Sequence, residues 1–547
     1  MNAERRYYGL ALTVITLLLC AKTVMTGAVP QQIHAHDCPL LYDGAWRVYN
    51  GFVPHVDFYS SLGPFTYLYL ALGYWVFGVS VHALAYMNAV ALAVLVLLTW
   101  TLLRGRMPDF WLFWACLLVG LCAMAPFPIR NPPSLLSYAL FYNRQGYAMM
   151  MLLSLLLYAP MANISTRRLA ASMCVAGVLL SAMLFCKVSF FVASVPMVAA
   201  FWYFERERPW ERLAWGAAGF AVPSLLFLTY LRFDLAGMYG DLSMTAKAKT
   251  SYLSLHWHDF IATAIEQIAP NLLCVLVILF GWIFLATGNA AGDDAGQAAP
   301  AKPSVRPLLH EMSLLVLLAG CTMFAVFTCS IGGLALDYPL LASTALVLCA
   351  RHSPSDRVPS TLWPGMRKQW AYLAMVAVTA YASLPSIWTY GESVVRTPPV
   401  PPDNLLRFNS PNVADILFYP DQWRPLYVTM TNDAVNLIAK HRIQGKSMLA
   451  FEYTQFFAFA TRSPSVGGSP FVEANVTVSP EAYPPAERYI AGVDYIFFPK
   501  FPSTRATVNI LYKAYAEYVW QRYRPLDESD YWTLWVRNDL APPQDAR

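Results

Sequence analysis

Long apolar runs separated by short polar stretches occupy the first two thirds of the chain. A helix needs roughly 20 apolar residues to cross the hydrocarbon core of a bilayer. No small-residue cleavage pattern follows the first run, which favours a retained helix over a signal peptide. We predict about eleven membrane-spanning helices, at 8–27, 81–103, 109–125, 137–160, 169–186, 188–204, 213–231, 261–287, 311–330, 335–350 and 370–388.

The hydrophobic pattern changes after residue 389. Prolines crowd the stretch 398–402 and mark a linker. Beyond it, predicted helices alternate with predicted strands, which indicates a small soluble α/β domain. No glycine-rich loop follows a predicted strand, so the pattern does not indicate a nucleotide site. We expect a transmembrane domain at 1–389, with a long first loop and its juxtamembrane helices at 28–80, and an α/β domain at 390–547, with helices at 432–441 and 509–522 and strands at 447–453, 495–499 and 531–536.

Composition agrees with a membrane protein and excludes several other classes. Apolar residues make up 57% of the 547 residues and charged residues only 13%, whereas a soluble domain carries roughly 25% charged residues. The mean hydropathy is +0.42. No basic cluster indicates a nucleic-acid partner. Of the ten cysteines, all but Cys38 lie in or beside apolar segments without metal-ligand spacing, so we interpret them as packing residues.

Basic residues predict how the chain is oriented. Short cytoplasmic loops hold an excess of Lys and Arg, and here the basic loops alternate with the other loops at every predicted span. We therefore expect a multi-pass protein of the plasma (inner) membrane with a cytoplasmic N-terminus. The C-terminal domain is expected on the outer side, which is the periplasm in a Gram-negative cell. The basic loops contain Arg5, Arg6, Arg104, Arg106, Arg167, Arg168, Arg206, Arg208, Arg212, Lys302, Arg306, Arg351, Arg357, Arg367 and Lys368.

Charged and titratable residues also gather in the loops of the predicted outer side. Charges at the ends of membrane helices are costly unless they are paired or solvated, so a cluster on one face is a candidate site. Ordinary loop solvation is the alternative for any single member. The members are Asp37, Asp43, Asp57, Arg130, Arg144, Lys187, Lys247, Lys249, His256, His258, Asp259 and Asp337.

The first outer loop carries a resemblance to a known superfamily. From His36 to Ser80 the loop resembles the polytopic GT-C glycosyltransferases, which include protein mannosyltransferases and the lipid A aminoarabinose transferase. These proteins have an acidic residue soon after the first helix, usually Asp-Glu, and this chain has Asp43-Gly44 in its place. The absence of the second acid at Gly44 puts any role of that acid in doubt. The remaining motif positions are filled by Trp46, Arg47, Gly51, Pro54, Asp57, Phe58, Gly63, Pro64, Phe77 and Gly78.

Shorter stretches elsewhere are similar to the same superfamily. Asn143-Arg144 opens the fourth predicted span, and Lys187 stands in a short turn between the fifth and sixth. Asp337-Tyr338 precedes a late span in a way that resembles the superfamily's last outer turns. The motif resemblance covers about 45 residues, and the predicted architecture extends it over the whole chain.

The resemblance implies transfer of a sugar from a polyprenyl-phosphate carrier to a hydroxyl acceptor, with inversion at the anomeric carbon. Asp43 is then the first candidate for the general base and Asp57 the second. A loop salt bridge is the alternative for Asp43, and Asp57 could instead hold the loop. The pattern names no cofactor, and a divalent cation stays open, with these two acids as its candidate ligands.

Cations at the membrane face would neutralise the departing phosphate. Lys187, Arg144 and Arg130 are the candidates, although a lysine at this place can also simply mark a helix end. His256 and His258 flank Trp257, and an interfacial loop anchored by that tryptophan is the alternative to a ligand site. Asp337 and Tyr338 complete the candidate residues.

Two other classes of function stay open. A transporter or flippase of envelope lipids would show repeated halves and charges near mid-membrane, and the sequence has neither. A non-catalytic scaffold with the same fold is compatible with Gly44. The pattern leaves the sugar open, and also whether the acceptor is a lipid, a polysaccharide or a protein.

Overall fold

The computed structural model describes most of the chain. The described residues are 3–34, 37–128, 132–160, 164–204, 209–255, 258, 273–283, 317, 321, 339–352, 366–396, 404–421, 424–490 and 492–540.

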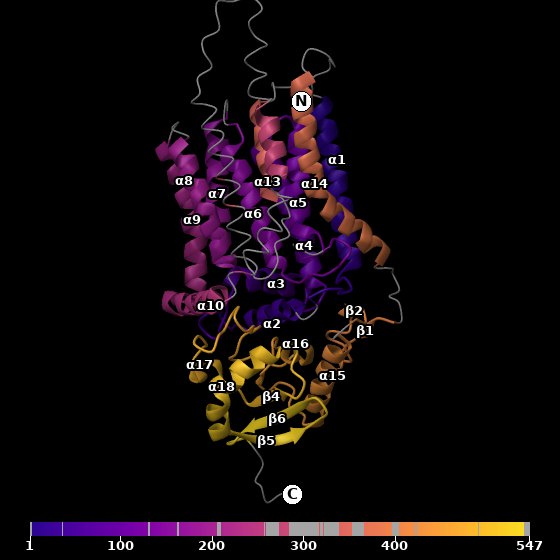
Figure 1. Ribbon diagram of the computed structural model, residues 1–547, viewed down its shortest axis with the longest axis vertical. Coiled ribbons are helices and arrows are strands. Elements are labelled where there is room, and N and C mark those ends of the chain that lie inside the picture. The colour runs from indigo at the N-terminus through magenta and orange to yellow at the C-terminus, as the bar shows by residue number, and fades with distance from the viewer. Residues whose placement is uncertain are drawn as a thin grey trace, which may run out of the picture.

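Long helices form a bundle above the C-terminal domain (Figure 1). Five stretches are long and apolar enough to cross a membrane, and they lie in α1, α4, α7, α9 and α14, while α5, α8 and α13 are apolar but shorter. The chain is therefore a multi-pass membrane protein. The total of about eleven spans stays a prediction, because the runs at 261–287 and 311–330 lie largely outside the described residues. The bundle helices are α1 (Ala3–Thr26), α4 (Ala83–Leu103), α5 (Asp109–Met124), α6 (Phe141–Tyr158), α7 (Thr166–Cys186), α8 (Val188–Phe204), α9 (Pro209–Tyr230), α13 (Pro339–His352) and α14 (Met366–Arg396).

Small residues allow α7 and α9 to cross closely. A Cβ added to Gly177 would lie 2.1 Å from the backbone oxygen of Gly216, and one added to Gly219 would lie 2.0 Å from that of Cys174. Apolar side chains gain little by leaving lipid, so membrane helices associate through such close packing.

Arginines at the end of the bundle near the N-terminus connect several helix ends. Arg5 forms an ion pair with Asp109 at 2.9 Å. Arg106 donates to the backbone oxygens of Leu156 and Ala159, and Arg351 donates to that of Tyr158. Described members of the basic set therefore share one end of the bundle, as the alternation of loops predicts.

Shorter helices lie between the opposite end of the bundle and the C-terminal domain. They are α2 (Asp37–Tyr49), α3 (Pro64–Phe77) and α10 (Leu235–Leu255), and α2 and α10 run across the bundle axis (Figure 1). We call this side of the bundle the domain end. The predicted first loop therefore forms a helical layer on which the C-terminal domain rests.

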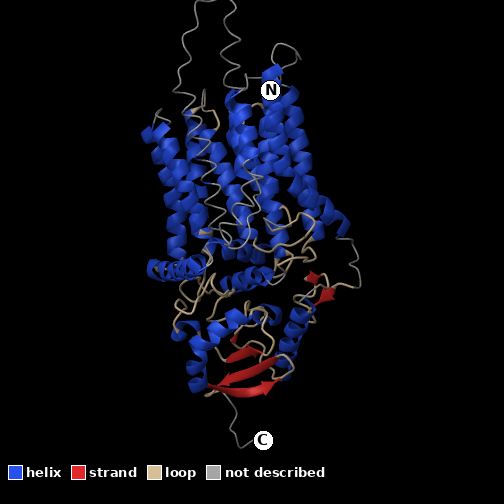
Figure 2. Ribbon diagram, viewed as in Figure 1, coloured by secondary structure: helices blue, strands red, loops and turns tan. Residues whose placement is uncertain are grey.

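The C-terminal domain contains a four-stranded sheet with the order β3-β4-β6-β5 (Figure 2). Strand β3 is parallel to β4, and the other neighbours are antiparallel. The strands are β3 (Met448–Ala450), β4 (Tyr495–Pro499), β5 (Tyr523–Glu528) and β6 (Trp532–Arg537), with a separate pair of β1 (Leu406–Arg407) and β2 (Leu417–Phe418). The helices are α15 (Arg424–Lys440), α16 (Phe457–Thr461), α17 (Ala486–Tyr489) and α18 (Arg505–Arg522).

The predicted helices 432–441 and 509–522 correspond to α15 and α18, and the three predicted strands correspond to β3, β4 and β6. The sequence analysis did not predict α16, α17, β5 or the short pair β1 and β2. Strand β5 (YRPLDE) contains a proline and charged residues, and of its six residues only Tyr523 is buried, so hydrophobic alternation gave no strong signal. Helix α14 continues to Arg396, past the predicted boundary at residue 389.

Aromatic side chains join α2 to the C-terminal domain. The Trp46 indole donates to the backbone oxygen of Ser463 at 2.8 Å. The ring of Phe459 stacks on Tyr42 and on Tyr74, with centroids 5.6 and 5.9 Å away. Arg462 lies over Phe459 at 4.3 Å. Because these groups are mostly buried, the first loop and the C-terminal domain form one packed unit.

Candidate functional site

Asp43 lies on α2 inside the contact with the C-terminal domain. Its carboxylate accepts a 2.7 Å hydrogen bond from Arg47 Nε, one helical turn later, and neither side chain is exposed. Arg47 also donates to the Gly467 backbone oxygen and, at 3.0 Å, to Gln455 Oε1. Burial raises the pKa of Asp43, while the Arg47 charge and the Ser465 hydroxyl oppose the rise. This buried ion pair ties α2 to the C-terminal domain.

Packing explains the glycine that follows Asp43. A Cβ at Gly44 would lie 2.2 Å from the ring of Tyr67, which is fully buried. No larger residue fits unless α3 shifts. The second acid of the usual Asp-Glu pair is therefore excluded here by the Tyr67 ring, and its absence by itself does not indicate a loss of function.

Asp57 caps a turn in the first loop. Its carboxylate accepts from the Val53 backbone N–H at 2.7 Å and faces both terminal nitrogens of Arg232 at 3.5 Å. The Asp57 and Arg232 side chains are 27% and 59% exposed. Asp57 therefore stabilises the first loop near the protein surface.

A second buried ionic group was not predicted. Asp241 of α10 accepts from Arg488 of α17 at 2.5 Å, from His55 Nδ1 at 3.0 Å and from the Ser60 backbone N–H at 3.1 Å. Arg488 also donates to the His55 backbone oxygen. The group joins the first loop, α10 and the C-terminal domain, so α10 is held in the same packed unit.

Asp37 at the start of α2 marks a different place, where the bundle, α2 and the C-terminal domain meet. The Tyr453 hydroxyl donates to Asp37 Oδ1 at 2.6 Å, and both side chains are buried. His34 Nδ1 lies 3.9 Å from the other carboxylate oxygen. Like Asp43, Asp37 is an acid soon after the first helix, but the sequence analysis did not choose it.

Glu473 of the C-terminal domain lies near Asp37. Burial, together with the charge of Asp37, raises the pKa of Glu473 to about 7, and Lys249 of α10 opposes the rise. Burial raises the pKa of the Tyr453 hydroxyl, and the charges of Asp37 and Glu473 raise it further. Glu473 and Tyr453 therefore both ionise less readily here than in water. A carboxyl that titrates near neutral pH can exchange protons during a reaction.

Lys187 reaches the same region from the membrane side. It lies between α7 and α8, donates to Asn143 Oδ1 at 3.0 Å, and lies 5.3 Å from the centre of the Tyr142 ring. Tyr142 is in turn close enough to Tyr453 to affect its ionisation. Tyr142 thus links Lys187 to Tyr453, a residue that the sequence analysis did not single out. We call these residues the junction cluster: Asp37, Tyr142, Lys187, Lys249, Tyr453 and Glu473.

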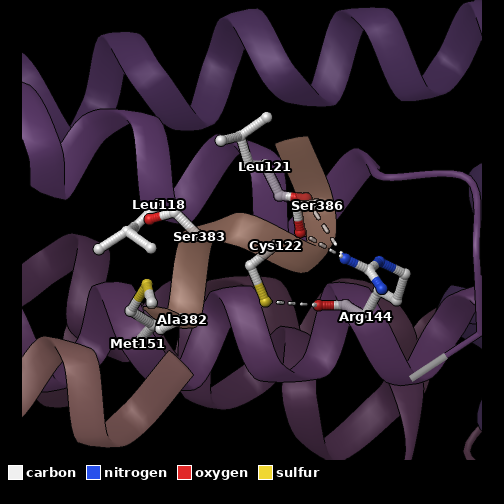
Figure 3. Close-up of a pocket in the computed structure, with 8 residues that line it drawn as sticks. All are labelled: Leu118, Leu121, Cys122, Arg144, Met151, Ala382, Ser383 and Ser386. Carbon is white, nitrogen blue, oxygen red and sulfur yellow. Dashed lines mark hydrogen bonds between the residues drawn. The ribbon is translucent and has the colours of Figure 1, made fainter. Parts of the chain in front are cut away.

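Arg144 follows Asn143 on α6 but points to another place. Its guanidinium donates to the Phe127 backbone oxygen at 2.9 Å and to Ser386 Oγ of α14 at 3.2 Å, and it lies 4.3 Å from the centre of the Phe127 ring. Beside it is a cavity of about 10 Å³, roughly the room that one water needs. Figure 3 shows Arg144 at the edge of this cavity with Cys122 and Ser386. A phosphate role for Arg144 stays a prediction.

Several predicted site residues cannot be placed. Arg130, His256, Asp337 and Tyr338 lie outside the described residues, and His258 is exposed. Among the described residues, no group of three or more His, Cys, Asp or Glu is placed to hold a metal ion. Asp43 and Asp57, the predicted cation ligands, each face an arginine instead.

Solved structures of two other proteins align with this chain over most of its length at low sequence identity. The crystal structure of ArnT from Cupriavidus metallidurans in the apo state gives a TM-score of 0.43 and 11% identity, covering 99% of this chain and 100% of that one. The same protein bound to undecaprenyl phosphate gives 0.44 and 13%, covering 98% and 99%.

The archaeal oligosaccharyltransferase AglB from Archaeoglobus fulgidus, in complex with an inhibitory peptide and a dolichol-phosphate, gives 0.39 and 11%, covering 91% of this chain and 70% of that one. No protein-family model and no curated protein matches the sequence.

Proposed function

We propose that this protein is a membrane glycosyltransferase that moves a sugar from a polyprenyl-phosphate carrier to a hydroxyl acceptor. The observation that supports it is the junction cluster, where Lys187, between two membrane helices, contacts Asn143 and the Tyr142 ring, and Tyr453 of the C-terminal domain donates to Asp37 of α2. A lipid-linked donor needs both parts. Its tail lies among membrane helices, and its sugar and phosphate stand at the polar end.

The reaction requires a base and a cation. The acceptor oxygen forms a bond to the anomeric carbon and gives its proton to a carboxylate, while the carbon–oxygen bond to phosphate breaks and its electrons leave with the phosphate. Lys187 would stabilise that phosphate as a point charge. Attack from the side opposite the phosphate inverts the anomeric carbon, as the resemblance implies.

The base comes from α2, which offers two acids. The geometry favours Asp37, because it lies in the junction cluster beside Tyr453 and Glu473. Asp43 is neutralised by Arg47, and neither of these side chains is exposed. Both acids are buried against the C-terminal domain, so the ion pair with Arg47, and not exposure, distinguishes Asp43 from Asp37. The sequence-based choice of Asp43 stays a prediction, and Asp37 is our structural alternative to it.

Removing the Lys187 charge is expected to weaken donor binding. Losing a charge-assisted hydrogen bond costs about 1.5–3 kcal/mol, or roughly a tenfold to hundredfold loss of affinity. Lys187→Ala should show this loss in titrations with a polyprenyl-phosphate sugar, while Lys446→Ala, an exposed lysine of the C-terminal domain, should not. Equal affinity in the two variants would mean that Lys187 only marks a helix end.

The site is proposed to face the outer side of the plasma membrane, as the distribution of basic residues predicts. Lys446→Cys in the C-terminal domain should react with an impermeant thiol reagent in intact cells. Arg167→Cys at the other end of the bundle should react only after permeabilisation. Both wild-type side chains are exposed, so access through the membrane decides the result. The reverse pattern would invert the topology.

Turnover distinguishes an enzyme from a flippase or a scaffold. The purified full-length protein, mixed with polyprenyl-phosphate sugars and extracted envelope material, should release the carrier phosphate and transfer the sugar to lipid, polysaccharide or protein. Movement of the intact donor across vesicles without cleavage would support the transporter alternative. A protein that neither cleaves nor moves the donor would support the scaffold.

A further inference from the structure

Lys22 of α1 is a cation near the domain end of the bundle that takes no part in the proposed reaction. Its ammonium donates to the Ser393 hydroxyl of α14 and lies 5.7 Å from the centre of the Tyr390 ring. We propose that Lys22, Tyr390 and Ser393 bind the phosphate group of a membrane phospholipid. This site is separate from Lys187, which lies between α7 and α8 on the other side of the bundle (Figure 1).

Two helices place Lys22 at the border of the hydrocarbon core. From Arg5 to Lys22, α1 rises about 26 Å. From Trp370 to Trp388, whose indoles are both exposed, α14 rises about 27 Å, and tryptophan is enriched at both membrane interfaces. Both lengths are close to the roughly 30 Å of hydrocarbon in a bilayer. Ser393 lies beyond Trp388, so its lysine partner stands at the level where lipid headgroups begin.

The charge of Lys22 is not neutralised by an acid. In the described ranges no carboxylate lies within ion-pair distance of its ammonium, which contacts only a hydroxyl and a ring. Glu392, the acid next to Ser393, is paired with Arg396 at 2.7 Å. An ammonium that is half-buried among membrane helices is costly without a counter-charge, so this arrangement favours an anionic partner.

The Tyr390 hydroxyl offers a second donor at the same place. The side chain is 7% exposed, and its hydroxyl makes no hydrogen bond of ordinary geometry to the part of the chain that the structure describes. Its neighbour Thr23 donates instead to the Leu19 backbone oxygen at 2.8 Å. The Ser393 hydroxyl donates to the Tyr390 backbone oxygen at 2.8 Å, which ties the group together. A phosphate oxygen would accept from the buried phenol and remove the cost of leaving it unpaired.

The face of α14 that carries these groups also meets a second cation. Ser386, Tyr390 and Ser393 recur at helical spacing and are buried, and Arg144 of α6 donates to Ser386 Oγ at 3.2 Å. Pro385 interrupts the backbone hydrogen bonds of α14, and the last turns of the helix lean away from the bundle (Figure 1). Two cations therefore face one side of a bent helix, and basic pockets between membrane helices are typical sites for lipid headgroups.

A phospholipid fits this place because α1 and α14 border the bilayer here. Met25 of α1 is 86% exposed and Trp388 of α14 is 59% exposed, beside the buried Tyr390 and Ser393. The acyl chains would lie along these exposed apolar side chains, while the phosphate meets Lys22. The phosphate accepts from the ammonium as a charge-assisted hydrogen bond.

The test titrates the full-length protein in non-ionic detergent with phosphatidylglycerol and with diacylglycerol, which lacks the phosphate. Lys22→Met should weaken binding of phosphatidylglycerol about tenfold or more and leave binding of diacylglycerol unchanged, because only a charge-assisted hydrogen bond is lost. Tyr390→Phe should weaken phosphatidylglycerol about two- to tenfold, the effect of a neutral hydrogen bond. Lys22→Arg keeps the charge and should bind like the wild type, as should Lys446→Met, which changes an exposed lysine of the C-terminal domain.

Two further probes decide the source of the phosphate. Inorganic phosphate should compete only at concentrations far above those of the lipid, and competition at equal concentrations would overturn the assignment to a lipid. Polyprenyl phosphate is compared with polyprenol in the Lys187→Ala background, where the proposed donor site is weakened. A Lys22 effect confined to polyprenyl phosphate would make this a second site for the carrier and overturn the assignment to a phospholipid.

Equal affinity of the wild type and Lys22→Met for phosphatidylglycerol would overturn the proposal, and Lys22 would then only tie α1 to α14. Thermal unfolding in the same detergent checks that each variant is folded. If Lys22→Met does not fold, Tyr390→Phe decides in its place. The proposal does not rest on the proposed function, because it stands even if the protein transfers no sugar.

Discussion

Replacing Asp37 by Asn is expected to lower the rate of sugar transfer by about 10²–10⁴-fold, the usual cost of losing a general base. The amide oxygen can still accept the Tyr453 hydrogen bond, so the fold and the contact between α2 and the C-terminal domain should survive. The amide cannot take the acceptor's proton. Single-turnover transfer from a saturating polyprenyl-phosphate sugar measures the chemical step, and a separate titration should show unchanged donor affinity.

Asp57→Asn is the matched control for that experiment. It removes a carboxylate from the same loop, but one that caps a turn and faces an exposed arginine. It should keep most of the activity. If Asp37→Asn turns over normally while Asp57→Asn does not, the base is Asp57, the second candidate of the sequence analysis.

Asp43→Asn is expected to act on stability first. The substitution leaves the Arg47 guanidinium buried without its counter-charge, and breaking a buried pair in this way typically costs about 3–5 kcal/mol. The variant should therefore unfold at lower temperature in detergent, and the C-terminal domain should become more sensitive to protease. Asp57→Asn should change stability by less than about 1 kcal/mol, because the amide oxygen can still accept from the Val53 N–H and Arg232, the partner in its ion pair, is 59% exposed.

A double variant separates the two roles of Asp43. Asp43→Asn combined with Arg47→Gln removes both charges, and it should recover part of the stability that the single change loses. Activity should return with stability if Asp43 is structural. A folded Asp43→Asn protein that binds donor but transfers nothing would instead make Asp43 the base and displace Asp37.

Asp43 and Asp37, the two acids of α2, show what the sequence predicted and what needed the tertiary structure. The resemblance of the first loop pointed to an acid after the first helix, and the sequence analysis chose Asp43, followed by Trp46 and Arg47, without weighing Asp37. The salt bridge that the sequence left open as the alternative for Asp43 is present in the structure, because Arg47, four residues later, shares its helix face. The same structure brings Tyr453 to Asp37.

Sequence by itself determined the class of this protein. Long apolar runs predict membrane-spanning helices, because a helix in lipid satisfies its own backbone hydrogen bonds. The alternation of basic loops along the sequence predicted that these loops share one side, and Arg5, Arg106 and Arg351 do lie at one end of the bundle. Local alternation predicted two helices of the C-terminal domain, which correspond to α15 and α18, and three strands of its sheet, since these depend on neighbours in the chain.

Tertiary structure alone decided the composition of the candidate site. Lys187 stood out in the sequence because a charge in an apolar run is conspicuous. Glu473 and Tyr453 did not, because polar and aromatic residues are ordinary in a soluble domain and neither belongs to a local motif. Their importance comes from contacts with α2 across more than 400 residues. No periodicity encodes such a contact, since it exists only when the C-terminal domain packs on the first loop and burial changes the chemistry of its acids.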